Sequence, residues 1–476
     1  MLFNSFEFFI FLPIIFFLYW VIFKYNLKFQ NALILLASYV FYSWWDWRFL
    51  SLIIISTIID YLIGLKIYKS NDLHIKRYYL LFSIIVNLGI LGFFKYYNFF
   101  IDSWIILLNS VGYYPSSVWT LNVILPVGIS FYTFQTMSYS LDIYYNKLKP
   151  TRDIISFAAF VSFFPQLVAG PIERASNLIP QILNKRTFKY NNGVQGLRLI
   201  LWGMFKKVVV ADSLSLQVDY CFNNYHTLNG GLLFLGLIYF SFQIYCDFSG
   251  YSDIAIGTAK LFGIDLMKNF KYPYFSRNVA EFWRRWHISL STWFRDYMYI
   301  PLGGSKMGKW ISIRNIFIIF IISGFWHGAN WTFIAWGLCH AIIYIPLFLS
   351  GRNRIFTNNS IYGKRWLPSF TELFQMATTF LFVTFSWVFF RSENIVISFK
   401  YLFNIITKFS IPFVNGNHVS VILLLLFLEW TFYNNKIDIL NYKSKIIRIG
   451  VYILISNLCL INIIETSNKT FIYFQF

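Results

Sequence analysis

The chain has 476 residues, of which 57% are hydrophobic and only 13% are charged. A soluble globular protein carries about 25% charged residues, so this composition excludes an ordinary water-facing surface. A net charge of +20 would suggest nucleic-acid binding in a soluble protein. In a membrane protein, basic residues gather in the cytoplasmic loops, and we therefore expect no nucleic-acid partner.

The first half of the chain is predicted to contain a series of spanning helices of about 20 apolar residues each. Residues 1–23 have no basic n-region and no small-residue cleavage site, which predicts a retained first span. Lys24 and Lys28 follow this span, which predicts that the N-terminus lies outside. Residues 154–170 are apolar but end in Pro165 and Gly170-Pro171, so we expect a helix that enters the membrane and turns back. The predicted spans here are 6–23, 30–45, 49–65, 78–110 with a kink, and 122–141.

The second half continues this pattern, and its loops differ in charge. Residues 264–314 are densely basic and are predicted to be cytoplasmic, whereas residues 213–230 contain no Lys or Arg and are predicted to lie outside. The whole chain, 1–476, is predicted to be one all-α domain of about 11 spanning helices plus re-entrant segments. Its C-terminal tail, 466–476, is expected outside the bacterial inner membrane. The predicted spans here are 196–212, 231–247, 313–326, 330–349, 372–390, 419–434 and 447–464.

Two histidines are candidates for catalysis. His327 lies between two apolar segments, and Gly324 and Gly328 beside it allow close approach of a substrate or another backbone. His287 lies in an amphipathic segment that is rich in Trp and Arg. An imidazole can take a proton from a hydroxyl that attacks a thioester. Either histidine could instead be structural, His327 bonded to a neighbouring helix and His287 an interfacial anchor.

Other polar segments leave alternatives open. The Pro/Gly-broken segment 126–135 suits a tunnel wall or a kinked packing helix, and Glu173-Arg174 suits a local ion pair. Asp247 and Asp253 are predicted to lie at a helix break, without the ligand spacing of a metal site. No GxSxG, Walker or GxGxxG motif indicates a soluble-type hydrolase or nucleotide site.

A series of motifs resembles the membrane-bound O-acyltransferase (MBOAT) family, and within it the alginate O-acetylase (AlgI-type) and peptidoglycan O-acetyltransferase branch. These motifs recur in chain order from residue 126 onward. They are the segments 126–135 (PVGISFYTFQ), 164–172 (FPQLVAGPI), 245–253 (YCDFSGYSD), 282–291 (FWRRWHISLS), 295–304 (RDYMYIPLGG) and 324–328 (GFWHG).

The resemblance implies a ring of helices around a central tunnel, which a cytosolic donor and an external acceptor approach from opposite faces. It maps the essential histidine of the family onto His327 and the family's second polar residue onto His287. No bound cofactor or metal is expected, and acetyl-CoA or another acyl thioester is the expected donor. The residues expected to bind substrate or line the tunnel are Ser130, Gln135, Arg284, Arg285, Trp286, Trp326 and Asn330.

The chain ends in Phe471-Ile-Tyr-Phe-Gln-Phe476, which is similar to the Phe-x-Tyr-x-x-Phe ending seen in related bacterial systems. In the teichoic-acid D-alanylation system, a small separate partner carries this ending. The resemblance implies that Tyr473 is an acyl relay, because a phenol activated by an imidazole can form a reactive ester. An interfacial cluster of aromatic residues is the alternative.

The sequence therefore predicts an acyltransferase that passes an acetyl group across the membrane. We expect a separate extracytoplasmic SGNH-type transferase or esterase to place the group on a polysaccharide such as peptidoglycan or alginate. D-alanyl transfer to teichoic acid is an alternative within the family. A transporter of lipid-linked sugars is the alternative from another class, since broken helices and midplane polar residues occur there too.

Overall fold

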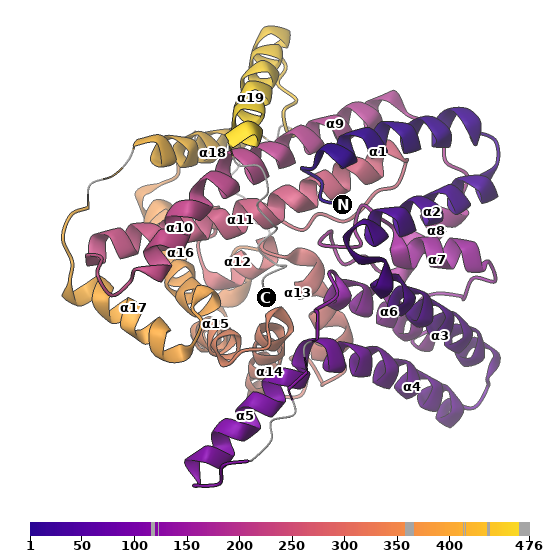
Figure 1. Cartoon of the computed structure of the whole chain (residues 1–476), viewed down its shortest axis with the longest axis horizontal. Helices are drawn as coiled ribbons and strands as arrows, with labels where there is room; N and C mark the ends of the chain where they lie inside the picture. Colours follow the sequence, from indigo (N-terminus) through magenta and orange to yellow (C-terminus); the bar gives the residue numbers. More distant parts are fainter. Residues whose placement is uncertain are drawn as a thin grey trace. The chain divides into compact units, whose positions relative to one another are not determined.

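The computed structural model describes residues 1–115, 120–121, 123–357, 366–412, 414, 416–435 and 438–465. These residues form helices joined by loops, without a β-strand among them (Figure 1). Eight helical segments of this described part are long and apolar enough to cross a membrane. The predicted all-α, multi-pass membrane protein is thereby confirmed. The chain divides into two compact units, each of which is described by itself.

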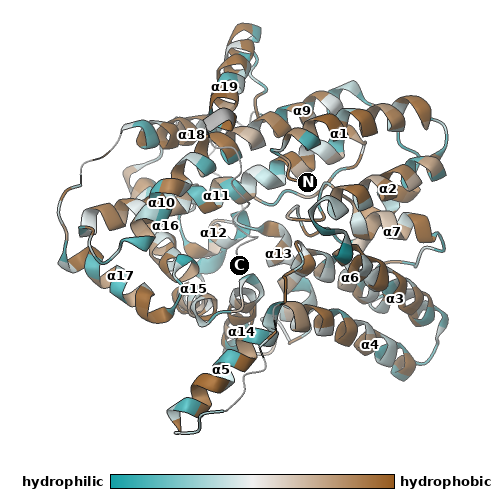
Figure 2. Cartoon of the chain, viewed as in Figure 1, coloured by the Kyte–Doolittle hydropathy of each residue, from teal (hydrophilic) through white to brown (hydrophobic). Residues whose placement is uncertain are grey.

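The first unit comprises Met1–Val194 and Thr258–Met267. Several of its helices begin at a side chain that accepts hydrogen bonds from unpaired backbone N–H groups, as Asn26, Asp72 and Asp153 do. Figure 2 shows mostly hydrophobic residues along α2, α3 and α4. The elements are α1 (Phe6–Phe17), η1 (Leu18–Ile22), α2 (Leu27–Asp46), η2 (Trp47–Phe49), α3 (Leu50–Lys69), α4 (Leu73–Leu91), η3 (Gly92–Tyr96), α5 (Tyr97–Ser110), α6 (Ile129–Tyr144), α7 (Ile154–Ser162) and α8 (Ala175–Leu183).

The spanning helices of this unit are polar inside and apolar outside. Asp60, at the middle of α3, is fully buried and accepts hydrogen bonds from Ser83, Asn87 and Ser140 on α4 and α6. Ile58 and Leu62 beside it are about half exposed. An apolar outer surface around a bonded polar interior is the arrangement that a bilayer stabilises.

Two of the motifs pack together within the first unit. Gly128 has a φ of +76°, and a Cβ atom there would lie 2.8 Å from the carbonyl oxygen of Leu167. The side-chain amide of Gln135 donates to the carbonyl of Phe160, at the end of α7. Helix α7 ends at Ser162 and the chain continues without regular structure to α8, as the two prolines and the glycine of this segment predict. Glu173 accepts hydrogen bonds from Asn177 and from the backbone of Met267.

The second unit comprises Gln195–Gly257 and Lys268–Phe476. Among the elements of this unit, α9 begins in the first unit and α11 ends in it. The other elements of this unit lie entirely within it. Its elements are α9 (Tyr190–Met204), η4 (Phe205–Asp212), α10 (Ser213–Asn223), α11 (Gly230–Leu261), η5 (Pro273–Phe275), α12 (Val279–Arg285), α13 (Ile288–Phe294), η6 (Arg295–Tyr299), α14 (Lys309–His327), α15 (Trp331–Leu349), η7 (Arg352–Arg354), α16 (Phe370–Arg391), α17 (Ile395–Thr407), α18 (Gly416–Asn435) and α19 (Lys445–Glu465).

Helices α14 and α15 form a tightly packed antiparallel pair. A Cβ atom on Gly324 would overlap the carbonyl oxygen of Phe333, and one on Gly337 would overlap the carbonyl oxygen of Phe320. Small residues at such contacts let the backbones of membrane helices approach closely. Gly324 therefore serves helix packing, which is the close approach of another backbone that the sequence left open beside the approach of a substrate.

The predicted helix break at Asp247 and Asp253 is wrong. Helix α11 continues without interruption from Gly230 to Leu261. Both carboxylates are paired on the neighbouring π-helical segment η4: Asp247 lies 2.6 Å from the ammonium of Lys207, and Asp253 lies 2.6 Å from that of Lys206. Because opposite charges neutralise the acids in place, the helix does not have to end to expose them.

Candidate active site

His327 lies at the last position of α14, where the chain turns into α15. A Cβ atom on Gly328 would overlap the ring of Phe333, so only glycine fits there. Asn330 then starts α15 by accepting a hydrogen bond from Thr332 N, and its amide donates to the carbonyl of Glu393. This tight turn holds the imidazole of His327 inside the unit, where it is 4% exposed.

His287 is the residue before α13 and adopts the left-handed conformation, with φ 44° and ψ 54°. This conformation is unfavourable for a residue with a Cβ atom, and it indicates a constraint imposed by the surroundings. The side chain is 1% exposed, and its Nδ1 lies 3.1 Å from Oδ1 of Asn269. Burial lowers the pKa of His287 to about 3, because the charged imidazolium is poorly solvated there.

The two histidines lie close together within the second unit. Their ring centroids are 6.2 Å apart. The ring of Trp326 lies beside both, with centroids 5.9 Å from His287 and 5.0 Å from His327. The pair was predicted from two motifs that are 40 positions apart in the chain, and the fold places them in one site.

An aromatic shell surrounds this pair. Trp336 and Phe390 meet the His327 ring edge-on, at 5.2 and 5.4 Å between centroids, and Phe248 meets the His287 ring at 4.7 Å. Trp286, predicted to line the tunnel, is 1% exposed and stacks on Phe282. Such a shell excludes water and strengthens electrostatic interactions inside the site.

A cavity of about 430 Å³ in the second unit lies along the same helix as His327. Its lining includes Ser323, which is one helical turn before His327 and therefore on the same face of α14. Three arginines line the cavity, and one of them, Arg295, pairs with Asp296 at 2.6 Å. Most of the other lining side chains are aromatic or aliphatic, and the remainder are serine, asparagine and threonine. The lining residues that matter here are Arg284, Arg295, Arg354, Trp283, Leu290, Phe294, Phe320, Ser323 and Tyr344.

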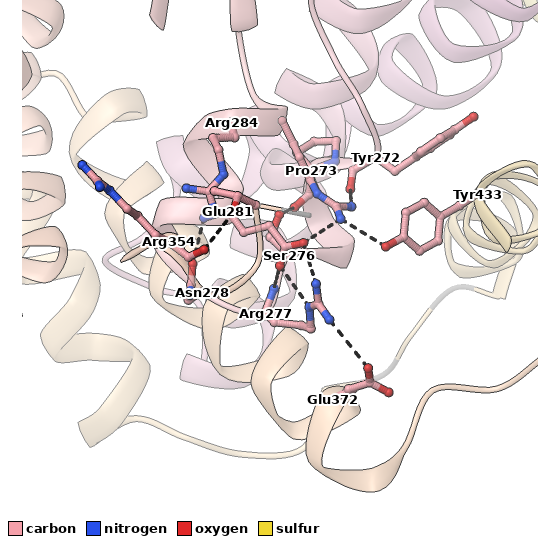
Figure 3. Close-up of polar contacts among 12 residues, drawn as sticks. Tyr272, Pro273, Ser276, Arg277, Asn278, Glu281, Arg284, Arg354, Glu372 and Tyr433 are labelled. Atoms are coloured by element: carbon pink, nitrogen blue, oxygen red, sulfur yellow. Dashed lines mark hydrogen bonds and ion pairs between the residues drawn. The ribbon is translucent and has the colours of Figure 1, made fainter. Parts of the chain in front are cut away.

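The two predicted arginines of α12 have different partners; Figure 3 shows the polar contacts around this helix, with Arg284, Glu281 and Tyr433 among the labelled residues. Arg284 lines the cavity and donates to the carbonyl of Asn353. Arg285 instead donates to Glu281 and to the hydroxyl of Tyr433, and Glu281 also pairs with Arg277. Arg285 therefore belongs to a buried ionic cluster that joins α12 to α18.

His340 is bonded to a wall of the cavity, whereas the sequence suggested only that it is a structural or loop residue. The indole Nε1–H of Trp283, a cavity-lining residue, donates to Nδ1 of His340 at 3.3 Å. Nε2 of His340 lies 3.0 Å from the hydroxyl of Ser386 on α16. His340 thus fixes the orientation of one wall of the cavity. The sequence signal available for these bonds was the position of His340 in an apolar helix, because buried histidines in such helices are usually hydrogen-bonded.

The remaining predicted site residues lie elsewhere. Ser130 and Gln135 belong to α6 of the first unit, where Ser130 accepts a hydrogen bond from Lys95. Asn330 caps α15 as described above. Tyr473 lies outside the described residues. The roles of these four residues as tunnel, substrate-binding or relay groups stay predictions.

Comparison with known proteins agrees with the motifs. The model of the membrane-bound O-acyltransferase family matches residues 39–388. The probable alginate O-acetylase AlgI of Pseudomonas syringae pv. tomato is 43% identical over 389 residues, which are 81% of this chain and 71% of the relative. The peptidoglycan O-acetyltransferase of Helicobacter pylori is 37% identical over 425 residues, covering 83% and 77%. The teichoic acid D-alanyltransferase of Bacillus subtilis is 27% identical over 366 residues, covering 70% and 89%.

Both histidines, the cavity-lining arginines and the tightly packed α14–α15 pair fall within the matched residues. The relatives are acyltransferases by name, and two of the three compared transfer acetyl groups. The chain belongs to the membrane-bound O-acyltransferase family and is an acyltransferase.

Proposed function

We propose that this protein moves an acetyl group from a cytosolic thioester across the inner membrane, for attachment to an envelope or exported polysaccharide. The observation that carries the proposal is the pair of buried histidines, one of which ends the helix whose Ser323 lines a cavity that also contains three arginines. The more similar relatives compared above, an alginate O-acetylase and a peptidoglycan O-acetyltransferase, support acetyl as the group and a glycan as its destination.

The donor is acetyl-CoA or another acyl thioester that carries phosphate. Arg284, Arg295 and Arg354 supply positive charge for the phosphates, and the apolar wall of the cavity suits the arm that bears the thioester. The basic loops of the second unit face the cytoplasm in this proposal, and both termini lie outside.

The acceptor of the first transfer is the hydroxyl of Tyr473. His327 takes the proton of this hydroxyl as the phenol oxygen attacks the thioester carbonyl. The new C–O bond forms, the C–S bond breaks, and the departing thiolate takes the proton from the imidazolium. A separate extracytoplasmic SGNH-type protein then receives the acetyl group from the tyrosine and passes it to the polysaccharide.

His327→Ala tests the central step. We expect glycan O-acetylation in cells to fall by about a hundredfold or more, because a general base contributes 10²–10⁴ to the rate. His226→Ala is the matched control, since His226 lies at a different cavity of the second unit, and it should leave acetylation unchanged. Normal acetylation by a correctly inserted His327→Ala protein would contradict the proposal.

Tyr473→Phe tests the relay separately, because it removes one oxygen atom. Acetyl-CoA cleavage and acetyl-tyrosine should both disappear in the purified variant. If glycan acetylation continues at the normal rate, the acyl group reaches its acceptor without Tyr473. Offering D-alanyl and acetyl donors to the purified wild-type protein distinguishes the two chemistries of the family. Cleavage of either thioester excludes the alternative that the protein is a transporter.

A further inference from the structure

Asn269 makes an unusual set of contacts with the segment that carries His287. Its main-chain carbonyl accepts from Ile288 N at 2.9 Å. Its side-chain Oδ1 accepts from the backbone N–H of Ser289 at 3.3 Å and from the hydroxyl of Ser289 at 2.9 Å. Asn269 is 1% exposed, so none of these bonds is shared with bulk water. Together they hold His287 in its left-handed conformation, which the isolated chain would avoid.

The orientation of the Asn269 amide is determined by these contacts. A backbone N–H can only donate, so the atom facing Ser289 N must be the oxygen. The amide nitrogen then points to the hydroxyl of Ser252 on α11, 3.2 Å away, where it can donate. The alternative orientation would place two donors against each other at Ser289.

The position of the imidazole proton follows from the amide. Nδ1 of His287 lies 3.1 Å from Oδ1 of Asn269, and an amide oxygen can only accept. Nδ1 must therefore carry the hydrogen. In a neutral imidazole the other nitrogen, Nε2, then has the lone pair. The low pKa of His287 that results from burial agrees with a neutral ring.

We propose that Asn269 is a positioning residue, which holds His287 as the Nδ1–H tautomer with Nε2 as its basic nitrogen in the acyl-transfer site. This proposal rests on the proposed function, because it assigns a use to the His287 ring in that reaction. The rings packed on His287 belong to Phe248, Phe270, Trp326 and His327, of which His327 is titratable. The polar groups at its Nδ1 are the amide oxygen of Asn269 and, at 3.5 Å, the hydroxyl of Ser289, and neither is titratable.

The tautomer can be measured without any activity. Nitrogen-15 spectra of the full-length protein labelled at its histidines distinguish Nδ1–H from Nε2–H rings, and the difference from His287→Gln assigns the signal among six histidines. We expect Nδ1–H in the wild type and loss of this preference in Asn269→Leu. An Nε2–H ring in the wild type would overturn the proposal, even if His327→Ala abolishes activity.

Kinetics supply the second measurement. Asn269→Leu should lower kcat at least tenfold with a small change in the donor KM, because it affects the ring and not the cavity. Asn269→Asp keeps the acceptor oxygen and adds a negative charge beside Nδ1. This charge should restore most of kcat and move the acidic limb of the pH profile upward by about 1 to 3 units.

Asn31→Leu is the matched control for loss of a buried asparagine. Asn31 is 2% exposed and bonds Ser156 and the carbonyl of Ile182 in the first unit. Per folded molecule, this variant should keep the wild-type tautomer and pH profile. Equal pH profiles for Asn269→Asp and the wild type would contradict the positioning role. Active His327→Ala and His287→Ala variants would instead refute the proposed function and leave the tautomer result standing.

Discussion

At the scale of single residues, the site combines chemistry that the sequence could predict with constraints that it could not. His327 was selected as a candidate because an imidazole between apolar segments is costly unless it is used, and His287 because it lies in an amphipathic segment rich in Trp and Arg. Their catalytic roles stay predictions. The contacts of Asn269 and His340 could not be predicted, because their partners are distant in the chain. Asn269 bonds a segment that begins 18 positions later, and His340 bonds Trp283, which is 57 positions earlier.

The burial of His287 makes a prediction about stability and pH. The ordinary pKa of the ring is 6.5, and in the folded protein it is about 3. As the pH falls from about 6.5 to about 3, His287 binds a proton in the unfolded chain but not in the folded protein. Protonation therefore favours the unfolded chain, and the folded protein progressively loses stability. His287→Gln should therefore lose less thermal stability than the wild type between about pH 7 and about pH 5.

Thermal unfolding of the purified protein at several pH values measures this difference. His74→Gln is a suitable control, because His74 is exposed at the start of α4. It should show the same pH dependence as the wild type. Parallel pH dependences for His287→Gln and the wild type would mean that the ring is not buried as a neutral group.

At the scale of helices, apolar segments were predictable, whereas helix boundaries near charged residues were not. The break expected at Asp247 and Asp253 is absent because Lys206 and Lys207 pair with these acids. Both lysines lie inside the predicted span 196–212 and are 3% and 4% exposed. Opposite charges in two spans were the signal for this contact. A single sequence does not say which pairs of spans are neighbours.

The contact between α14 and α15 makes a prediction at this scale. Gly324→Ala should push the two helices apart, because the new methyl group would overlap the backbone of Phe333. His327 ends α14 one turn later, so we expect both a lower melting temperature and a loss of activity. In small domains, overpacking of this kind costs about 1–3 kcal/mol.

Gly89→Ala in α4 is the matched control, since apart from the neighbouring turns of its own helix no atom lies within 4 Å of the position of its Cβ. It makes the same chemical change in another spanning helix and should be tolerated. Melting temperature and acetyl transfer of the two variants, measured in the same detergent, provide the comparison. A harmless Gly324→Ala would show that the helix contact is loose enough to adjust.

At the scale of the whole molecule, composition and loop charge were enough to predict a polytopic membrane protein, and ordered motifs were enough to predict its family. They did not predict the two compact units or the ionic cluster around Glu281. Such features arise from contacts between distant segments, whose energies depend on geometry. The orientation in the membrane is likewise a prediction from the basic loops, and it determines which side supplies the donor.

Cysteine accessibility in intact cells tests that orientation within the second unit. In a background without the four native cysteines, Asn224→Cys should react with an impermeant maleimide, because residues 213–230 are predicted to lie outside. Lys306→Cys, in the basic segment, should react only after the cells are permeabilised. Both side chains are exposed, so burial does not explain a difference.

The reverse labelling would place the cationic cavity on the side that contains no acyl-CoA, and the cytosolic thioester would then be excluded as donor. Labelling of both cysteines from outside would mean that residues 264–314 do not face the cytoplasm. With the expected labelling, the cavity faces the cytosolic donor pool. The acyl group alone then has to cross, because Tyr473 is predicted on the opposite side.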